Sequence, residues 1–337
     1  MTGVAHIVAR AVADDPHTLG VLALADAMGP PGVIGAEPAS GGQGVDASTL
    51  AALDPTAVAV YHQCGAAPTL VGRLVERGAP LAVVHGATPP DHLARRDLQA
   101  LAAAGALGLV TSGAAAARLV DVGFRRVVRV PPVVARERLL AVEASESTTH
   151  HLDLVLRGPL VVNVGSLATA APSARLVQAH HVLRTYLLRS AHLAIAVPDS
   201  GATSEAAVRR VAREIWGLRL TDAWIHRLVA GERAALVRRA RVFVTTDPAC
   251  GDAGEALAAM AEGLPVVATA DARAAELLGD GAVLLPPDAT ASLLAEAVTD
   301  LLEHEPRRAR LAAAAVRAVA QFDPVRIAPI WRAALAA

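Results

Sequence analysis

Short apolar runs alternate along the whole chain with stretches whose apolar residues recur at helical spacing. Leu81–His85 (LAVVH) and Leu160–Val164 (LVVNV) are typical runs, and Pro68–Arg77 is a typical helical stretch with Val71 and Leu74 on one face. A strand that is apolar throughout is buried on both faces, so helices must cover both sides of its sheet. The alternation therefore predicts an α/β protein with doubly wound, parallel, Rossmann-like sheets.

The same reading gives a set of expected elements. The expected strands are Ala5–Val12, Gly32–Ala36, Ala57–His62, Leu81–His85, Leu107–Thr111, Val127–Val130, Leu160–Val164, His192–Val197, Leu218–Asp222, Val242–Thr245, Pro265–Ala268 and Ala282–Leu285. The expected helices include His17–Met28, Pro68–Arg77, Ser173–Arg189, Thr203–Trp216, Ala230–Arg239, Gly254–Glu262 and Ala291–Glu303.

A length of 337 residues is too great for one ordinary core and suits two domains. Ala141–His151 is polar and has no apolar period, so we place a linker there. We expect an N-terminal domain at 1–145, a C-terminal domain at 152–320, and a last helix at 322–337 that crosses back to the first domain. Two doubly wound domains imply a ligand cleft at the carboxyl ends of their strands.

The charge balance excludes several classes of partner. Lysine does not occur, the net charge is −1 and the pI is near 6.9, so neither nucleic acid nor an anionic membrane is expected as a partner. A phosphate group would have to be bound by arginine, histidine or backbone amides.

The apolar composition does not indicate a membrane protein. The longest uncharged stretch, Leu98–Ala117, is mainly alanine with three glycines and predicts a helix, a turn and a strand. Arg10 and Asp14 interrupt the region where a signal peptide needs an apolar core, so we expect a cytoplasmic protein without a transmembrane segment. Cys64 and Cys250 fit no metal or disulfide framework.

One segment of the second half resembles the most recognisable stretch of glycosyltransferase family 4. Gly251–Ala270 (GDAGEALAAMAEGLPVVATA) is similar to the family pattern E-G-F-G-x-x-x-x-E-A-M-A-x-G-x-P-V-V-A. Val162–Leu167 resembles the V-G-R-L segment that opens the family's second domain, and Ala240–Val244 resembles its A-D-V-F-V strand. In the first half, Tyr61-His62 and Val84-His85 resemble Y-H segments of one bacterial branch. The matches follow the family's order along nearly the whole chain.

The resemblance implies a GT-B fold, with an acceptor-side first domain and a nucleotide-sugar-side second domain. It implies a retaining, metal-independent transferase that takes a UDP- or GDP-linked sugar and needs no cofactor. Such an enzyme must place cations and amide donors against the diphosphate, and carboxylates against the sugar and ribose hydroxyls.

Residue by residue, the positions that the resemblance assigns to the donor are substituted. The phosphate-binding arginine falls on Ser166 and the following lysine near Ala171, and the two glutamates of the E-x7-E pair fall on Cys250 and Ala258. Gly251 keeps the family's glycine. The family's glycine-rich loop after the first strand is replaced by Ala13–His17 (ADDPH), which has two carboxylates. The donor site is therefore expected to be eroded.

Two glutamates near this segment could suggest a different register. Glu255 and Glu262 are seven residues apart and share one helical face, and we interpret them as charges on a helix surface. Asp252 and Glu255 stand at a helix start, where they would cap the helix and occupy its anion site.

Other residues are candidates for the cleft. His85 falls where the family has a histidine beside the transferred sugar, and the alternative is a histidine bonded to local backbone at a strand end. His62, Thr88 and Gly165 are further cleft candidates, with His62 the most structural of them. Ser112 opens an S-x-x-x-A-R-x-L segment and is expected to cap a helix.

Relocated arginines could rebuild phosphate binding. Arg175, Arg184, Arg189 and Arg273 are the candidates, and their alternative role is to keep helix faces solvated.

Three functions remain open. The first is a family member with an eroded donor site that is weakly active or inactive and serves as a binding or protein-partner subunit. The second is an active retaining glycosyltransferase that moves a hexose through a rebuilt phosphate site. The third is another GT-B enzyme that acts on sugar phosphates. The resemblance implies a transferase, but the arginine, lysine and glutamates that it assigns to donor binding are missing. The sequence therefore leaves both an enzyme and an inactive protein open.

Overall fold

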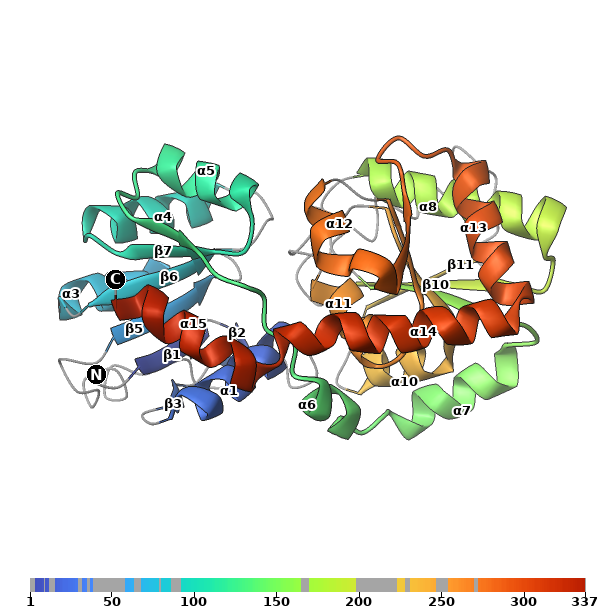
Figure 1. The fold of residues 1–337 in the computed structure, drawn as a ribbon, viewed down its shortest axis with the longest axis horizontal. Coiled ribbons are helices and arrows are strands. Elements are labelled where there is room, and N and C mark those ends of the chain that lie inside the picture. Colours follow the sequence, from blue (N-terminus) through green and yellow to red (C-terminus); the bar gives the residue numbers. More distant parts are fainter. Residues whose placement is uncertain are drawn as a thin grey trace. The chain divides into compact units, whose positions relative to one another are not determined.

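The computed structural model describes residues 4–8, 10–11, 16–29, 32–34, 37–38, 58–63, 68–78, 80–85, 92–164, 170–197, 223–227, 231–246, 254–269 and 272–336. The chain divides into two compact units. Unit 1 consists of Met1–Ala135 and Gln321–Ala337, and unit 2 consists of Arg136–Ala320. Each unit contains a six-stranded sheet (Figure 1).

The sheet of unit 1 is parallel throughout, in the order β3-β1-β5-β6-β7-β8. Its strands are β1 (Val4–Val8), β3 (Gly32–Ile34), β5 (Val58–Gln63), β6 (Leu81–His85), β7 (Leu107–Val110) and β8 (Val127–Arg129). A separate two-residue pairing joins β2 (Arg10–Ala11) to β4 (Glu37–Pro38).

Helices cover both faces of this sheet. Its helices are α1 (Pro16–Met28), α3 (Pro68–Arg77), α4 (His92–Ala103), α5 (Gly113–Val122) and α15 (Pro324–Ala336). On one face Ile7, Tyr61 and Val83 form a core with α3, α4 and α5. On the other face the alternate strand residues, such as Val60, form a core with α1 and α15. This two-sided burial explains why the strands are apolar at successive positions.

The last helix of the chain belongs to unit 1. Trp331 of α15 is 2% exposed within the core on the α1 side of the sheet, and its Nε1 donates to the Pro131 carbonyl oxygen at 3.3 Å. Arg332 Nη2 donates to the Ala27 carbonyl oxygen at 2.8 Å, and Val134 N donates to the Phe322 carbonyl oxygen at 2.9 Å. The end of the chain therefore covers a sheet whose strands all lie within its first 130 residues (Figure 1).

A pair of buried histidines lies beneath Trp331. His6 of β1 and His62 of β5 are 0% and 1% exposed, and His6 Nδ1 lies 3.0 Å from His62 Nε2. The indole of Trp331 stacks on the His62 ring at a centroid distance of 6.2 Å. Burial lowers the pKa of His6 from 6.5 to about 4, because the apolar surroundings disfavour the charged ring.

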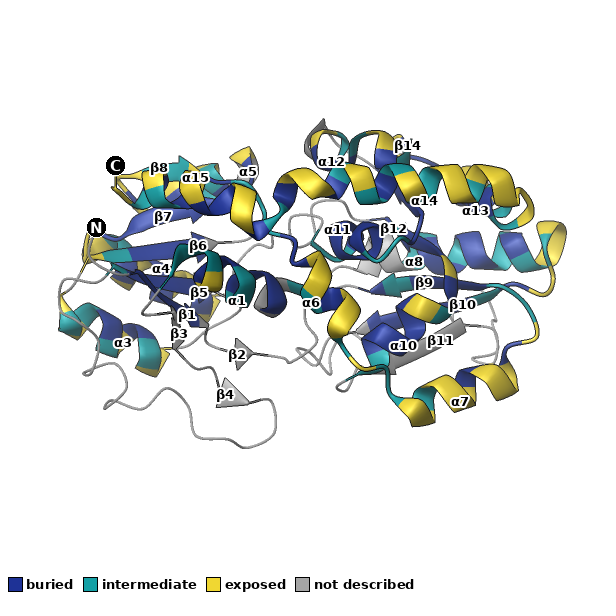
Figure 2. Cartoon of the chain, turned by 60° about the horizontal axis from the view of Figure 1, so that its bottom comes forward, coloured by how far each residue is buried: buried dark blue, intermediate teal, exposed yellow. Residues whose placement is uncertain are grey.

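Unit 2 has a second parallel sheet, in the order β11-β10-β9-β12-β13-β14. Its strands are β9 (Leu160–Val164), β10 (His192–Val197), β11 (Ala223–Arg227), β12 (Ala240–Thr245), β13 (Val266–Thr269) and β14 (Ala282–Leu285). Figure 2 shows buried strands such as β9 in dark blue, while α7 and α14 present exposed residues in yellow.

The helices of unit 2 complete the doubly wound fold. They are α6 (Arg136–Ala141), α7 (Glu146–Val155), α8 (Ala170–Val182) with its π-helical continuation η1 (Leu183–Leu187), α10 (Glu232–Arg239), α11 (Gly254–Ala261), α12 (Ala272–Leu278), α13 (Ala291–Glu303) and α14 (Glu305–Val319). Leu176, Val177 and Leu294 of α8 and α13 form a core with the strands.

One expected element differs from the structure. Ala141–His151, where we placed a linker, contains the start of α7, which is capped by Ser145 through a hydrogen bond from Thr148 N and contacts α10. A polar segment can be helical here because only Leu152 of α7 is buried. The strand expected at Leu218–Asp222 and the helix expected at Thr203–Trp216 lie outside the described residues, and the next described strand is β11.

The remaining expected elements match the structure to within a few residues, and β6, β9, β10, β14, α3 and α13 match at both ends. The predicted architecture of two doubly wound parallel sheets is confirmed. None of the helices in the described residues combines the length and apolarity needed to cross a membrane.

Replacing Trp331 with alanine should destabilise unit 1 by about 3–5 kcal/mol, because a large buried side chain leaves a cavity between α15 and the sheet. Urea denaturation checks this. Ile330→Ala on the same helix is the control, since Ile330 is 46% exposed and its loss should change stability by less than about 0.5 kcal/mol. Equal effects of the two substitutions would contradict the packing described.

Acid should weaken unit 1 through His6. The unfolded chain takes up a proton at this residue below pH 6.5, whereas the folded ring stays neutral until about pH 4, so stability is lost as the pH falls through that window. The loss amounts to roughly 3 kcal/mol when complete. Urea midpoints measured from pH 7 to pH 4 should fall less in His6→Leu than in the wild type.

The exposed histidine His92 provides the matched control for this pH series. His92→Gln should keep the wild-type slope. A His6→Leu profile parallel to the wild type would show that the buried histidine does not cause the acid sensitivity.

Candidate functional site

The strand order of unit 2 fixes where a ligand can bind. The connections run outward in opposite directions from β9 and β12, which are hydrogen-bonded neighbours. In doubly wound sheets ligands bind at this topological switch point, outside the carboxyl ends of the strands. The segments that follow these two strands are 165–169 and 247–253, both outside the described residues.

Most of the predicted donor positions fall on these segments or next to them. Gly165 and Ser166 follow β9, and Cys250, Gly251 and Asp252 follow β12, so all five lie outside the described residues but on connections at the same edge of one sheet. Two further positions are described.

Ala171 lies in the first turn of α8, directly after the segment that leaves β9. Ala258 lies in the middle of α11 and is 1% exposed. The E-x7-E resemblance assigns a carboxylate to Ala258, and in this chain a buried methyl group packs there instead.

A buried arginine of α10 forms ion pairs with two glutamates at the ends of α11, beside the switch point. Arg233, in the first turn of α10, is 3% exposed. Its Nε donates to Glu255 Oε2 at 3.0 Å, and its Nη1 donates to Glu262 Oε1 at 2.6 Å. Glu255 lies in the first turn of α11 and Glu262 follows the last turn, so the guanidinium side chain bridges both ends of that helix.

The interpretation of Glu255 and Glu262 as helix-surface charges is wrong. The Glu262 side chain is 3% exposed and the Glu255 side chain 22%, and both carboxylates are ion-paired. The seven-residue spacing does place them on one face, but Arg233 of α10 reaches that face and pairs with both carboxylates. Glu255 therefore binds a side chain of the neighbouring helix.

The ion pairs of the cluster stabilise the charged form of Arg233. Burial alone lowers the pKa of Arg233, but the charges of Glu255 and Glu262 and their hydrogen bonds outweigh this effect and raise the pKa above its ordinary value. Arg233 Nη2 and Glu262 Oε2 are buried without a hydrogen-bond partner among the described residues. One guanidinium therefore pairs with two carboxylates.

The relocated arginines lie at different edges of the sheet. Arg175, near the start of α8, donates from Nη1 to the Pro287 carbonyl oxygen at 2.6 Å; Pro287 follows the carboxyl end of β14. Arg184 lies in η1, and Arg189 lies in the turn between η1 and the amino end of β10. Arg273 begins α12, and its side chain is outside the description.

Of the candidate residues in unit 1, His62 and Ser112 have described side chains, and both are buried. His85 ends β6, with only its backbone described, and Thr88 lies outside the described residues. His62 is buried against His6 and Trp331, so its side chain belongs to the core and not to a surface cleft. Ser112 is buried and its Oγ accepts a hydrogen bond from Ala115 N at 3.2 Å, which confirms the predicted helix cap.

Two residues were missed by the sequence analysis, and each carried a signal. Arg233 precedes Leu236 and Val237 by three and four residues, a spacing that puts it on the apolar face of its helix. His6 alternates with Val4 and Val8 in the first strand, on the same face as both. Pattern alone could not supply their partners, which lie 22 to 56 positions away.

Residues 158–304 match the model of the family described as glycosyl transferases group 1. This segment of unit 2 is therefore similar to the group 1 glycosyl transferases. The match starts just before β9 and ends at the close of α13, so it includes every strand of the unit 2 sheet. No curated protein matches the sequence.

Solved structures match most of the chain. The α,α-trehalose-phosphate synthase (UDP-forming) of Burkholderia vietnamiensis is 16% identical, with a TM-score of 0.60 over 86% of this chain and 73% of the other. The corresponding protein of Burkholderia xenovorans is 19% identical, with a TM-score of 0.60 over 86% and 76%. The E. coli trehalose-6-phosphate structure bound with UDP-2-fluoro glucose is 15% identical, with a TM-score of 0.60 over 86% and 75%. The chain therefore has the GT-B fold of two Rossmann-like domains.

Within unit 2, Arg233 should be essential for stability. Arg233→Met leaves two carboxylates beside an apolar core without a counter-charge, which should cost about 3–5 kcal/mol in urea denaturation. The triple variant Arg233→Met/Glu255→Gln/Glu262→Leu should recover most of that loss. Arg310→Met, at an exposed position of α14, is the control. A cost for Arg233→Met as small as that of the control would contradict the buried pairing.

Proposed function

We propose that this chain is a GT-B protein whose donor site no longer grips a nucleotide diphosphate, and that it acts as a binding or partner subunit with little or no transferase activity. The site in question is the carboxyl edge of the unit 2 sheet at β9 and β12.

The state of Arg233 carries this proposal. It is a cation beside α11, the helix whose start the resemblance places against the donor, and both of its described ion pairs are with carboxylates of this chain. A diphosphate needs positive charge that is not already neutralised, because each charge-assisted hydrogen bond contributes about 1.5–3 kcal/mol. The charge of Arg233 is already matched by carboxylates of this chain, so it offers a diphosphate little attraction.

The substitutions at the family positions support the same conclusion. Ser166 and Ala171 stand where the resemblance assigns an arginine and a lysine, so two phosphate contacts are missing. Cys250 and Ala258 stand where it assigns the carboxylates that hold sugar and ribose hydroxyls. Burial of Ala258 in α11 supports a packing role at that position.

A rebuilt, active transferase is the second candidate, and Arg175 is the observation in its favour. Its guanidinium lies at the carboxyl edge, anchored to the Pro287 carbonyl oxygen, and a nucleotide sugar could compete for it. His85 would then stand on the sugar side, as the resemblance implies. UDP-2-fluoro glucose is bound in one of the matching structures, which makes UDP-sugars the first donors to test.

Titration with UDP, GDP and UDP-glucose tests the proposal. A site with a Kd of about 10 μM would stabilise the protein by about 2.7 kcal/mol at about 1 mM ligand. That stabilisation corresponds to a rise of roughly 5–10 °C in the melting temperature of a unit of this size. Because the proposal concerns the carboxyl edge, we expect no saturable heat, and no shift above about 1 °C, that is lost in Arg175→Gln.

A gain of function provides the positive control. Ser166→Arg/Ala171→Lys restores the two cations of the family pattern and should make UDP binding measurable if their loss is what abolished it. Saturable UDP binding by the wild type that disappears in Arg175→Gln would overturn the proposal and establish the rebuilt site. His85→Ala would then separate transfer from binding.

A further inference from the structure

Unit 2 has a basic pocket at the amino edge of its sheet, opposite the carboxyl edge where the donor site is expected. The pocket encloses about 440 Å³. It lies before the first residue of β9 and around the first residues of β12, at the amino ends of the strands. Its lining consists of Leu156, Arg157, Gly158, Pro159, Arg239, Arg241, Leu302, Glu305 and Arg308.

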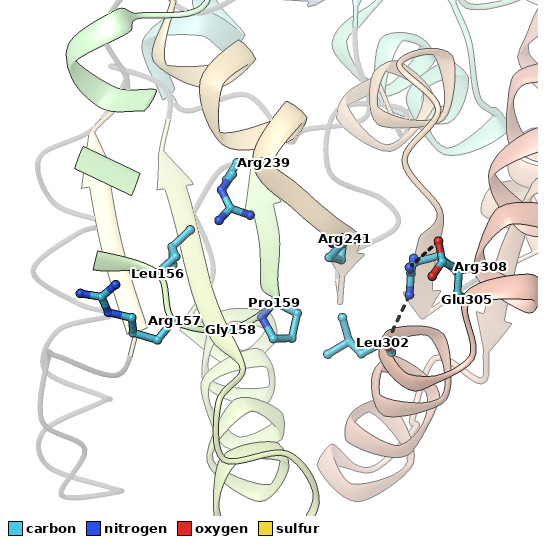
Figure 3. A pocket seen from close by; sticks show the side chains of 9 residues that line it. All are labelled: Leu156, Arg157, Gly158, Pro159, Arg239, Arg241, Leu302, Glu305 and Arg308. Carbon is cyan, nitrogen blue, oxygen red and sulfur yellow. Dashed lines mark hydrogen bonds and ion pairs between the residues drawn. The ribbon is translucent and has the colours of Figure 1, made fainter. Parts of the chain in front are cut away.

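The arginines enter from separate elements. Arg239 ends α10 and Arg241 is the second residue of β12, while the buried Ala240 between them anchors that strand in the sheet. Arg308 comes from the start of α14. Figure 3 shows Arg239 and Arg308 on different sides of the hollow, with Pro159 between them and Arg157 turned outward at the rim.

The pocket is positive after its own contacts are counted. Four arginines line it, and two carboxylates approach them: Asp153 Oδ1 lies 3.0 Å from Arg239 Nε, and Glu305 Oε1 lies 3.8 Å from Arg308 Nη2. Both carboxylates are well exposed, which weakens the pairs. Neither Arg157 nor Arg241 has an ion-pair partner among the described residues.

The walls are fixed in place by backbone contacts. Arg308 Nη1 donates to the carbonyl oxygens of Leu301 and Leu302 at 3.0 and 3.2 Å, which ties α14 to the end of α13. Gly158 lies directly against the backbone of Ser190, where a Cβ would collide with the Ser190 carbonyl oxygen. A pocket with such walls keeps its shape before a ligand arrives, which lowers the entropic cost of binding.

We propose that this pocket binds a phosphorylated small molecule. Arg239 and Arg241 would hold the phosphate oxygens, and the apolar surface of Pro159 and Leu302 would lie under the organic part. The volume is in the range of small-ligand sites, and guanidinium groups bind phosphate through paired N–H donors. The site is independent of the proposed function, because the sheet separates it from the carboxyl edge.

Calorimetric titration with pyrophosphate and with ribose 5-phosphate tests the proposal. Both probes should bind the wild type at one site per chain. Arg239→Gln/Arg241→Gln should weaken binding of each at least about 10-fold, since two charge-assisted contacts are lost. Arg310→Gln/Arg317→Gln removes the same charge from exposed positions of α14 outside the pocket and should leave both affinities within about 2-fold. Thermal melts establish that both variants fold.

A third variant distinguishes binding in this pocket from binding at the carboxyl edge. Arg175→Gln should leave binding unchanged, because Arg175 lies at the carboxyl edge. Loss of binding in Arg175→Gln with retention in Arg239→Gln/Arg241→Gln would overturn the proposal. Absence of saturable binding, or equal weakening in both double-arginine variants, would overturn it as well, since either result means that no specific site exists.

Discussion

A parallel sheet must be covered on both faces, and this constraint governs the whole chain. The strands of both units are apolar at consecutive positions, so neither face can remain in water. In unit 1 the chain returns after 185 residues of unit 2 to complete the cover with α15. Trp331 fills that layer and stacks on a buried histidine, so the polar pair His6–His62 is sealed by the last helix. An N-terminal half without residues 321–337 would lack part of its core.

Electrostatics shapes unit 2 in a comparable way. Arg233 lies in the interior beside α11, and a buried guanidinium is tolerable only with carboxylates against it. Glu255 and Glu262 supply them, which fixes α10 against α11. The same pairing neutralises Arg233, and this neutralisation is the observation behind the proposal that the carboxyl edge does not bind a diphosphate.

The two edges of the second sheet thus differ in electrostatic character. At the carboxyl edge, Arg233 is neutralised and Arg175 is bonded to a carbonyl oxygen. At the amino edge, Arg157 and Arg241 stand beside a hollow with two weak acidic neighbours. Among the described residues, these are the arginine arrangements that the two edges present. This distribution, more than any single substitution, motivates the functional proposals.

The amino-acid pattern determined the architecture, because periodicity and apolar runs are local properties: β6, β9, β10 and β14 lie where their residues predict, and Ser112 caps a helix as expected. Family resemblance identified the segment that matches the group 1 glycosyl transferases. The sequence by itself also showed that Ser166 and Ala258 differ from the residues of the family pattern. Tertiary structure decided what local pattern cannot encode, namely which charges meet. Glu262 is indistinguishable from a surface glutamate in sequence, and only the packing of α10 shows that it binds Arg233. The basic pocket likewise joins residues 157, 241 and 308, which become neighbours because parallel strands bring their amino ends to one edge.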